Sequence, residues 1–416
     1  MSTAGFLEKL LNGAKVEWVP LWQVTSWDKR FNAVARHKQP KIINFSHLLA
    51  VDLFKLDEPN GDIFLLSTGE RTGWTTQAKA GSLVHEGEVV TIPWGKSRPL
   101  REVIKYFKGK FVTGDNRIAT SNDTRVLDTK FLYYWLMHQA DSIDQFYRGA
   151  GIQHPSMAAV LDMEIPLPKI SVQAEIVRIL DSFTELTTEL TTELTARKKQ
   201  YNHYRDQLLS HPSGNMAWKP LGWVGEVRMC KRVMKNQTSD VGDIPFFKIG
   251  TFGRETNAFI PRALFEEFRD KYSYPKIGDV LISASGTIGR AVIFDGEEAY
   301  FQDSNIVWLE NDESKVLNKY LFYFYQIAKW HVSDGGVIKR LYNDNIKKTL
   351  IAVPYPDDPK KSLEEQARIV AILDKFDALT TSLTEGLPRE IALREKQYAY
   401  YRDQLLSFPK SDAEAA

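Results

Sequence analysis

The chain has 416 residues, and its 43% hydrophobic and 26% charged content is typical of a folded protein with roughly two to four domains. The 54 Lys and Arg residues nearly balance the 53 Asp and Glu residues, a charge that disfavours a free-standing nucleic-acid binder. Cys230 is the only cysteine, which excludes an internal disulfide and a multi-cysteine zinc site and fits a reducing compartment. No apolar run approaches the roughly 20 residues that span a bilayer, and the N-terminus lacks signal-peptide features, so we expect a cytoplasmic location.

Residues 1–171 predict an α+β domain that begins with a short helical piece, residues 1–15. "DIFLLSTGE" places apolar residues between a glycine and an acidic turn, which is the pattern of a short strand. "TKFLYYWLMHQADSIDQFY", which begins at Thr129, predicts a single amphipathic helix.

Residues 172–212 contain "FTELTTELTTELTARKKQYNHYRDQLLS", in which the tetrad Thr-Thr-Glu-Leu recurs. Apolar residues at spacings of three, four and seven predict one helix with a single narrow stripe over residues 172–209. At 1.5 Å per residue this helix would be about 57 Å long, far longer than a core helix, so we expect it to pack against a partner helix. The stripe consists of Ile176, Leu180, Phe183, Leu186, Leu190, Leu194, Tyr201, Tyr204 and Leu208.

Residues 213–360 predict a second α+β domain, and residues 361–416 predict a second long helix and a tail. "GDVLISASGTIGRAVIFDG" indicates short strands between glycines, and "NKYLFYFYQIAKWHV" indicates a single helix. Gly386 and Pro388 should kink or break the distal helix, because proline removes a backbone donor and clashes with the preceding turn. The expected boundaries lie near Ser171, between Ser210 and Asn215, and between Asp357 and Ser362.

The chain repeats itself. "QAEIVRILDSF" at Gln173 matches "QARIVAILDKF" at Gln366, and "KKQYNHYRDQLLS" matches "EKQYAYYRDQLLS" near the C-terminus. Weaker matches keep the same order, including "EWVPL" with "AWKPL" and "KFLYYWLM" with "KYLFYFYQ". We infer one frame built twice with altered side chains, and a cyclic organisation in which the N-terminal and C-terminal helical pieces lie together.

These helical segments, with "EGLPREIALREKQYAYYRDQLLSFP", resemble the two conserved helical regions of type I restriction-modification specificity subunits, and the tetrad repeat resembles the type IC group. "GDVLISASGTIGR" and "GGVIKRLYNDNIKKTLIAVPYP" are similar to parts of that family's target recognition domains. The resemblance covers the whole chain in organisation. It implies an α+β fold class in which two similar mixed α/β domains are separated by a pair of long antiparallel, coiled-coil helices.

The resemblance also implies a function. Each target recognition domain would read one half of a bipartite, asymmetric site in double-stranded DNA, and the helices would dock two methylation subunits, joined by restriction subunits in the full complex. The chain itself would be non-catalytic and would hold no cofactor. S-adenosylmethionine would belong to the methylation subunit, and ATP and Mg would belong to the restriction subunit.

No catalytic motif competes with this interpretation. "PWGKSRP" at Pro93 contains Gly-Lys-Ser, but a phosphate loop also needs a glycine at position 90, where this chain has valine. The Asn-Pro-Pro-Tyr and Asp-Pro-Pro-Tyr motifs of amino-methyltransferases do not occur in the sequence. His154 and His331 lack ligand-like neighbours, so we interpret them as surface or cleft histidines rather than metal ligands.

For DNA contact we expect loops that combine glycine with cationic, amide or hydroxyl side chains, which bond phosphates and base edges. "GGVIKRLYNDN" fits this well, whereas "SGTIGR" could equally be a tight hairpin and "SWDKRF" a solvated turn. The candidates in the first domain are Lys29, Arg30, Arg71, Thr72, Trp74, Lys96, Arg98, Arg148, Gln153 and His154. Those in the second domain are Lys231, Arg232, Lys235, Lys248, Ser285, Thr287, Arg290, Lys339, Arg340 and Tyr342.

The helical regions supply candidates for the spacer and for partner docking. Tyr201 and Tyr398 should pack within the coiled coil, and the Arg-Asp pairs that follow them should form ion pairs between helices or dock the methylation subunits. The full set is Leu186, Leu190, Leu194, Tyr201, Tyr204, Arg205, Asp206, Tyr398, Tyr401, Arg402 and Asp403.

A tetrad lengthens a helix by about 6 Å and rotates it by about 40°, so the leucine stripe nearly keeps its face. We therefore interpret the repeat as a ruler that sets the gap between the two DNA half-sites. The alternative function is a coiled-coil adaptor that holds two protein-binding domains, which the near-neutral charge would favour. Divergent loops on a repeated frame favour the DNA reader, since two different half-sites need two different surfaces.

Overall fold

The computed structural model describes residues 5–67, 69, 72–96, 98–114, 116–210, 215–332, 340–382 and 384–409. The chain divides into two compact units, one of Met1–Glu189 with Ile391–Ala416 and one of Leu190–Glu390. Each unit therefore combines a globular domain with parts of the long helices. Residues 211–214, at one expected boundary, lie outside the described residues.

The first unit contains, in its described part, a seven-stranded mixed sheet. Its main path is β2 (Thr25–Trp27), β8 (Asn116–Ser121), β6 (His85–Pro93), β7 (Lys105–Gly114), β4 (Ile63–Leu66) and β5 (Gly73–Thr75), with β3 (His47–Leu48) beside β7. Two further strand pairs join β1 (Glu17–Pro20) to β11 (Glu164–Leu167) and β9 (Tyr147–Arg148) to β10 (His154–Pro155). The short helices are α1 (Gly5–Leu11), α2 (Leu21–Val24), α3 (Ala50–Lys55), α4 (Gln77–Ala80), α5 (Thr129–His138), α6 (Ala140–Asp144) and α7 (Met157–Asp162).

The second unit has the same kinds of parts. One sheet has the order β13 (Gly225–Arg228), β19 (Ile306–Asn311), β16 (Val280–Ser283) and β17 (Ala291–Ile293). A second has the order β15 (Phe259–Ile260), β14 (Ile244–Phe247) and β18 (Tyr300–Phe301), and β12 (Met216–Pro220) pairs with β20 (Leu350–Pro354). The short helices are α9 (Leu221–Val224), α10 (Arg262–Lys271), α11 (Asn318–Tyr325) and α12 (Asn343–Lys348).

The two units share one topology. In the first, β4 runs parallel to β7 and antiparallel to β5; in the second, β14 runs parallel to β18 and antiparallel to β15. The single strand β7, which pairs with both β6 and β4, thus corresponds to two strands of the second unit. Strand β17 pairs with β16, and β18 pairs with β14. The predicted frame built twice is confirmed, although side chains between the matching elements differ widely.

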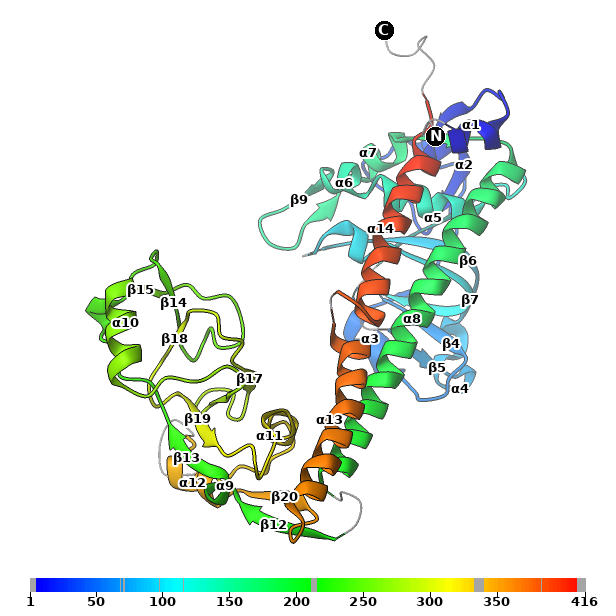
Figure 1. The fold of residues 1–416 in the computed structure, drawn as a ribbon. Coiled ribbons are helices and arrows are strands. Elements are labelled where there is room, and N and C mark those ends of the chain that lie inside the picture. The colour runs from blue at the N-terminus through cyan, green and yellow to red at the C-terminus, as the bar shows by residue number, and fades with distance from the viewer. Residues whose placement is uncertain are drawn as a thin grey trace. The chain divides into compact units, whose positions relative to one another are not determined.

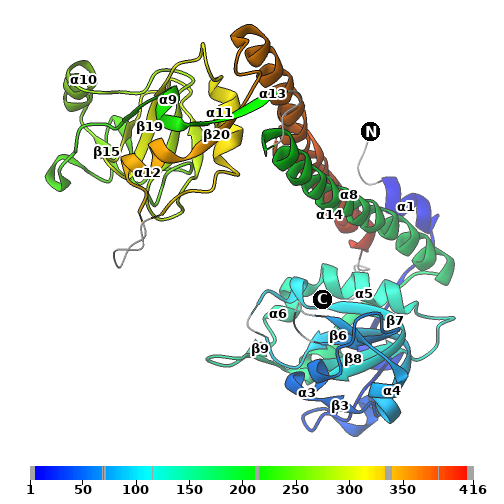
Figure 2. The same ribbon diagram turned by 90° about the horizontal axis from the view of Figure 1, so that it is seen from below.

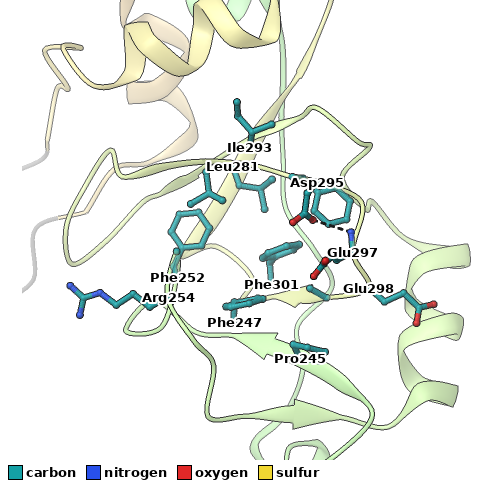
Figure 3. A pocket seen from close by; sticks show the side chains of 14 residues that line it. Pro245, Phe247, Phe252, Arg254, Leu281, Ile293, Asp295, Glu297, Glu298 and Phe301 are labelled. Atoms are coloured by element: carbon teal, nitrogen blue, oxygen red, sulfur yellow. Dashed lines mark hydrogen bonds between the residues drawn. The ribbon is translucent and has the colours of Figure 1, made fainter. Parts of the chain in front are cut away.

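The gap between β17 and β18 opens a pocket of about 440 Å³ in the second unit. The rings of Phe247 and Phe301 stack there with centroids 5.8 Å apart, and Leu281 closes the pocket on another side (Figure 3). Gly296, at φ +94°, lies in the segment that interrupts the strand path, where Asp295 and Gly296 favour a turn over extended chain.

The long helices are α8 (Ile170–Ser210), α13 (Pro359–Thr381) and α14 (Leu387–Leu406). In the first unit α8 lies beside α14 (Figure 1). The rings of Phe183 and Tyr401 stack there with centroids 5.3 Å apart. In the second unit α8 lies beside α13, and Tyr204 stacks on Phe376 at 5.8 Å. The predicted long helix and its pairing with the matching C-terminal segment are confirmed.

The distal helix is interrupted where glycine and proline predicted it. Helix α13 ends at Thr381, and Gly386 adopts φ +82° immediately before α14 begins. A Cβ at Gly386 would lie 2.4 Å from the carbonyl oxygen of Ala378, so only glycine fits this close return of the chain. Pro388 is the second residue of α14, where a backbone N–H has no helical partner to lose.

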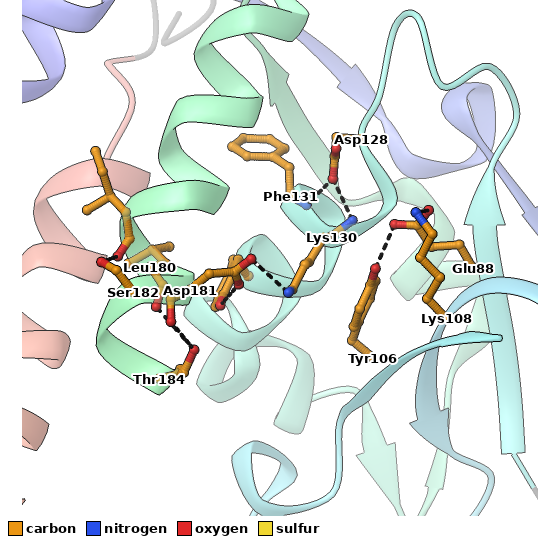
Figure 4. A network of polar contacts seen from close by, with 12 residues as sticks. Glu88, Tyr106, Lys108, Asp128, Lys130, Phe131, Leu180, Asp181, Ser182 and Thr184 are labelled. Carbon is orange, nitrogen blue, oxygen red and sulfur yellow. Dashed lines mark hydrogen bonds and ion pairs between the residues drawn. The ribbon is translucent and has the colours of Figure 1, made fainter. Parts of the chain in front are cut away.

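Matching polar anchors tie each domain to a long helix. Asp181 of α8 accepts bonds from Lys130 Nζ at 2.8 Å and Tyr134 Oη at 2.6 Å, both on α5 (Figure 4). In the second unit, Asp374 of α13 accepts from Lys319 Nζ and Tyr323 Oη of α11, each at 2.7 Å.

A second pair of anchors uses fully buried glutamine amides. The side chain of Gln173 accepts from the Asp128 backbone N–H and donates to two backbone carbonyls. That of Gln366 accepts from the Leu317 backbone N–H and donates to the Lys315 carbonyl and to the Ser362 hydroxyl. In both units the amide oxygen accepts from a backbone N–H and the amide nitrogen donates twice, so the duplication extends to individual hydrogen bonds.

The N-terminal helix α1 lies against the C-terminal helix α14 within the first unit. Phe6 of α1 packs edge-on against Tyr401 of α14 at 6.5 Å, and Leu7 shares a core cluster with Leu405. The indole Nε1 of Trp18 donates to the Pro409 carbonyl at 3.3 Å.

Two expected elements differ. The helix predicted over "NKYLFYFYQIAKWHV" ends at Tyr325 as α11, and residues 326–332 are not helical. The single helix predicted from Thr129 is divided into α5 and α6 at Gln139, which has φ −87° and ψ 8°. Helix α5 covers one face of the sheet (Figure 2) and buries Phe131, Tyr134 and Trp135, so apolar side chains surround more of it than an amphipathic stripe would.

Candidate nucleic-acid interface

In each unit, the loop after the central strand meets the segment before a short helix. In the first unit, Lys96 and Gln153 form an isolated antiparallel bridge, with N–H to carbonyl distances of 3.0 and 3.1 Å. In the second, Ser285 and Arg340 form the matching bridge. These bridges bring together segments that are far apart in sequence. They join "PWGK" to "GIQH" in the first unit and "SGTIGR" to Arg340 in the second.

The paired loops of the first unit present aromatic and imidazole groups. Trp94 is exposed, and its ring lies 4.6 Å from that of His154. The Nδ1–H of His154 donates to the Trp94 carbonyl oxygen at 2.9 Å, which leaves Nε2 on the far side of the ring. His154 is therefore a surface residue bonded to the loop, as expected.

Lys96 takes a different place from the one expected of a DNA contact. It is only 8% exposed, its Nζ lies 2.7 Å from Asp144 Oδ1, and it stands over the Tyr147 ring at 5.1 Å. Its charge is used inside the domain, so we leave Lys96 out of the proposed surface.

Most of the other first-unit candidates that the structure describes are exposed. Arg30, Thr72, Arg98 and Arg148 are exposed, Lys29 and Gln153 are half-buried, and Lys29 Nζ lies 3.9 Å from Asp28. Trp74 on β5 is exposed and packs edge-on against Phe64. Arg71 falls outside the described residues.

The second unit has a cationic cleft of about 330 Å³. Four residues that the sequence suggested for DNA contact line this cleft together: Arg232, Lys235, Lys248 and Arg340. The sequence alone could not establish that they cluster. The remaining wall includes Thr238, Gln302, Asp303, Ser304 and Asn305.

Hydrogen bonds set the orientation of the cleft's polar groups. The Ser285 hydroxyl donates to Asn305 Oδ1 at 2.8 Å, and the Ile249 N–H donates to Gln302 Oε1 at 3.0 Å. Arg340 donates to the Ser304 carbonyl at 2.7 Å. Arg232 pairs with Asp303 at 2.9 Å, which holds one guanidinium at the rim.

The other second-unit candidates are more dispersed. Lys231 stands over the Tyr272 ring at 4.9 Å, Arg290 donates to the Phe252 carbonyl at 2.9 Å, and Thr287 is exposed at the turn between β16 and β17. Tyr342, 56% exposed, precedes α12. Lys339 lies outside the described residues.

The "SGTIGR" segment forms the tight hairpin between β16 and β17. Gly289 adopts φ +82°, and a Cβ there would lie 2.2 Å from Trp330 Nε1. The turn geometry and the contact with Trp330 are therefore sufficient to explain the glycine at position 289. Ser285, from the same segment, contributes to the cleft through Asn305.

Sequence reasoning missed three polar residues beside these loops. The guanidinium of Arg117 on β8 lies over Phe31 at 5.3 Å and over Trp94 at 5.9 Å. Gln302 and Asn305 precede β19 and line the cleft. The sequence "FQDSNIV" offered a signal, a polar run leading into a strand, but it contains neither a glycine nor a cationic residue.

The expected docking residues recur as matched pairs. Arg205 bonds Asp206 at 2.8 Å and stacks over the Tyr201 ring, and Arg402 bonds Asp403 at 2.8 Å and stacks over the Tyr398 ring. Both ion pairs lie within one helix, and Arg402 is only 7% exposed, so its charge is used inside the unit rather than offered to a partner. Across helices, Asp403 approaches His138 Nδ1 at 3.3 Å, and Arg205 reaches Gln326 at 3.4 Å.

The stripe residues differ in burial. Ile176 and Leu180 are fully buried, whereas Leu186, Leu190 and Leu194 are half-buried. Tyr401 is also half-buried, and Tyr204 is 40% exposed. Apolar surface thus remains along the helices within each unit.

Burial raises the pKa of the Cys230 thiol to about 12, so this cysteine stays protonated and is no nucleophile near neutral pH. Among the described residues, no group of three or more His, Cys, Asp and Glu is arranged to hold a metal ion. None of the described helices combines the length and apolarity that crossing a bilayer requires.

The comparisons with known proteins agree on the family. The family model for the type I restriction modification DNA specificity domain matches residues 50–198 and 215–393. A type I restriction enzyme specificity subunit of Haemophilus influenzae is 46% identical over 412 residues, which cover 97% of this chain and 98% of that protein. The EcoR124I/EcoR124II specificity subunit of Escherichia coli is 31% identical over 433 residues, with 99% of each chain covered. This chain belongs to the type I restriction-modification specificity subunits.

Solved structures show the same fold. The S subunit of the type I restriction-modification system from M. genitalium matches with a TM-score of 0.56 at 15% identity, covering 96% of this chain and 98% of that chain. A second solved chain, described under complex assembly and conformational transition of the type I R-M system, matches with a TM-score of 0.52 at 16% identity. The match covers 94% of this chain and 98% of that chain.

Proposed function

We propose that each unit reads one half of a bipartite, asymmetric site in double-stranded DNA for a type I restriction-modification complex. The observation that carries this proposal is the loop bridge found in both units, Lys96 with Gln153 and Ser285 with Arg340. One architecture bearing different side chains is what two different half-sites require.

The two readers use different chemistry. The second cleft offers cations for phosphates, and the amides of Gln302 and Asn305 are held by their oxygen atoms, which directs the amide nitrogens toward acceptors on base edges. The first unit offers Trp94 and His154 beside Arg148. The near-neutral total charge is compatible with DNA binding because the cations are concentrated locally and partner subunits would add more.

The helices serve assembly and spacing in this proposal. Asp206 and Asp403, whose side chains are 59% and 53% exposed, give two equivalent faces for two methylation subunits, and restriction subunits join the full complex. The chain is non-catalytic and cytoplasmic, with S-adenosylmethionine bound by the methylation subunit and ATP and Mg by the restriction subunit. The tetrads at residues 187–194 set the gap between half-sites.

Mapping N6-methyladenine in cells that express the chain with its methylation subunit tests the proposal. The expected product is a two-part asymmetric motif. Asn305→Ala should relax one or two bases of a single half and leave the other half and the gap unchanged, at about 1–3 kcal/mol per lost base contact. Lys248→Ala should instead weaken binding of all sequences and lower the salt dependence by about one phosphate contact.

Lys271→Ala is the matched control, because Lys271 is exposed in the same unit but pairs with Glu267 at 3.1 Å outside the cleft. Methylation without sequence preference, or an Asn305→Ala motif altered in both halves, would contradict the two-reader proposal. If the complex assembles and no DNA selectivity appears, the adaptor function gains support.

A further inference from the structure

An apolar side chain stands at the tip of a hairpin in the first unit. Strands β9 and β10 pair Arg148 with His154, and the turn between them contains Gly149 and Gly151. Ile152 in this turn is 64% exposed and stands between the polar residues Arg148 and His154 of the two strands.

The base of the hairpin is firmly held. Tyr147 is buried, and its hydroxyl donates to the Pro93 carbonyl at 2.8 Å. The ion pair of the buried Lys96 with Asp144 and the two backbone hydrogen bonds between Lys96 and Gln153 fix the other side. The tip therefore projects from a rigid support.

The backbone of the neighbouring loop supports the isoleucine from behind. A Cβ at Gly95 would lie 2.6 Å from Ile152 Cγ2, so glycine at position 95 is what allows this close approach. Trp94, 44% exposed, continues the apolar surface next to His154. At the foot of the turn, the exposed Arg148 and His154 face each other across the two strands.

An apolar tip on a rigid stem, flanked by cationic or imidazole groups, has the chemistry of a side chain that wedges between stacked bases from the minor groove while its neighbours contact phosphates. We propose that Ile152 inserts at a base step of the half-site read by the first unit and unstacks it. This proposal rests on the proposed DNA-reading function and adds readout through DNA deformability. The step it enters should be a pyrimidine–purine step, since these unstack most easily.

The test uses the chain assembled with its methylation subunits and duplexes that carry 2-aminopurine at one position at a time, together with end labels that report bending by energy transfer. Methyltransferases themselves unstack the adenine they modify, so an increase in fluorescence at the target adenine is expected in any case. The wedge predicts a second increase, at a step in the first half-site, together with a bend.

Ile152→Ala should abolish the second increase and the bend, and should weaken specific binding about tenfold, on the scale of one mismatched base pair. Ile152→Leu should retain all three effects. Val51→Ala, which shortens an aliphatic side chain that is 71% exposed in the same unit, is the matched control and should change none of them. Unchanged recognition of the second half-site reports that the variant is folded.

The outcomes separate the two proposals. Specific binding with no second fluorescence increase, or an increase that survives in Ile152→Ala, overturns the wedge and leaves the DNA-reading function standing. Loss of binding in Ile152→Ala through failed assembly with the methylation subunits would make the tip a protein contact and also overturns the wedge. Absence of sequence-specific binding by the unaltered complex overturns the function itself.

Discussion

Strand β7 of the first unit runs unbroken for ten residues, whereas the second unit divides the same path between β17 and β18. The anchors show the opposite behaviour, because Asp181 and Asp374 bind the same Lys and Tyr partners in both units. The polar anchors are thus kept in both units, while a strand of the sheet varies. A frame that keeps its attachment to the helices can change its loops and clefts without changing how they are held.

The loop bridges extend this comparison to the sites. Both units bring a glycine-containing loop against the segment before a short helix, yet one surface presents Trp94 and His154 and the other presents a cleft with Lys248 and Arg340. The backbone arrangement is the common part, and the side chains are the variable part. Differences in target bases would therefore require few changes to the fold.

Deletion of residues 187–190, one Thr-Thr-Glu-Leu unit, separates spacing from reading and should have the largest effect. It removes about 6 Å of helix and about 40° of rotation, so the gap between half-sites should shorten by about one to two base pairs. Methylation of the original motif should be lost. Both half-site sequences should persist in a genome-wide methylation map, whereas altered half-sites with an unchanged gap would contradict the ruler.

Gln173→Ala and Gln366→Ala test whether the two anchors are energetically equivalent. Each substitution leaves buried backbone groups without their partner, so each should reduce the free energy of unfolding by about 3 kcal/mol. Urea denaturation measures both, and Gln207→Ala, an exposed glutamine of α8, should change it by less than about 0.5 kcal/mol. A large difference between the two buried sites would show that the duplicated anchors no longer do equal work.

The frame was predictable because its signals are local or repeated. The stripe around Leu186 repeats at helical spacing, Gly386 with Pro388 marks the interruption, and the match of Gln173 with Gln366 reveals the duplication. The α5 helix was predicted too long, because its buried aromatic residues hid the break at Gln139.

The sites were less predictable, because their geometry depends on residues distant in sequence. Lys96 looks like a free cation in "PWGKSRP", and only folding brings Asp144 within 2.7 Å of it. Asn305 becomes part of the cleft through the hydroxyl of Ser285, which no spacing rule connects to it. Residue type could suggest DNA-contact chemistry, but the choice among cations required the fold.

The smallest expected effect concerns a difference at the helix interface. His138 faces Asp403 in the first unit, and Ile327 has the matching position in the repeat of the second. Burial lowers the pKa of His138 below 6.5, although the nearby Asp403 opposes the shift. The unfolded chain therefore binds this proton more readily, so stability holds above pH 6.5 and decreases as the pH falls below it toward the lowered value.

His138→Ile, which copies the second unit, should remove this dependence. The melting temperature of the unaltered chain should fall between pH 7 and pH 5.5 by about 2 °C more than that of the variant. His203→Ile alters an exposed histidine and serves as the control, so it should leave the slope unchanged. Equal slopes for the unaltered chain and His138→Ile would mean that the imidazole keeps its ordinary affinity for protons, and that Ile327 differs from it in packing alone.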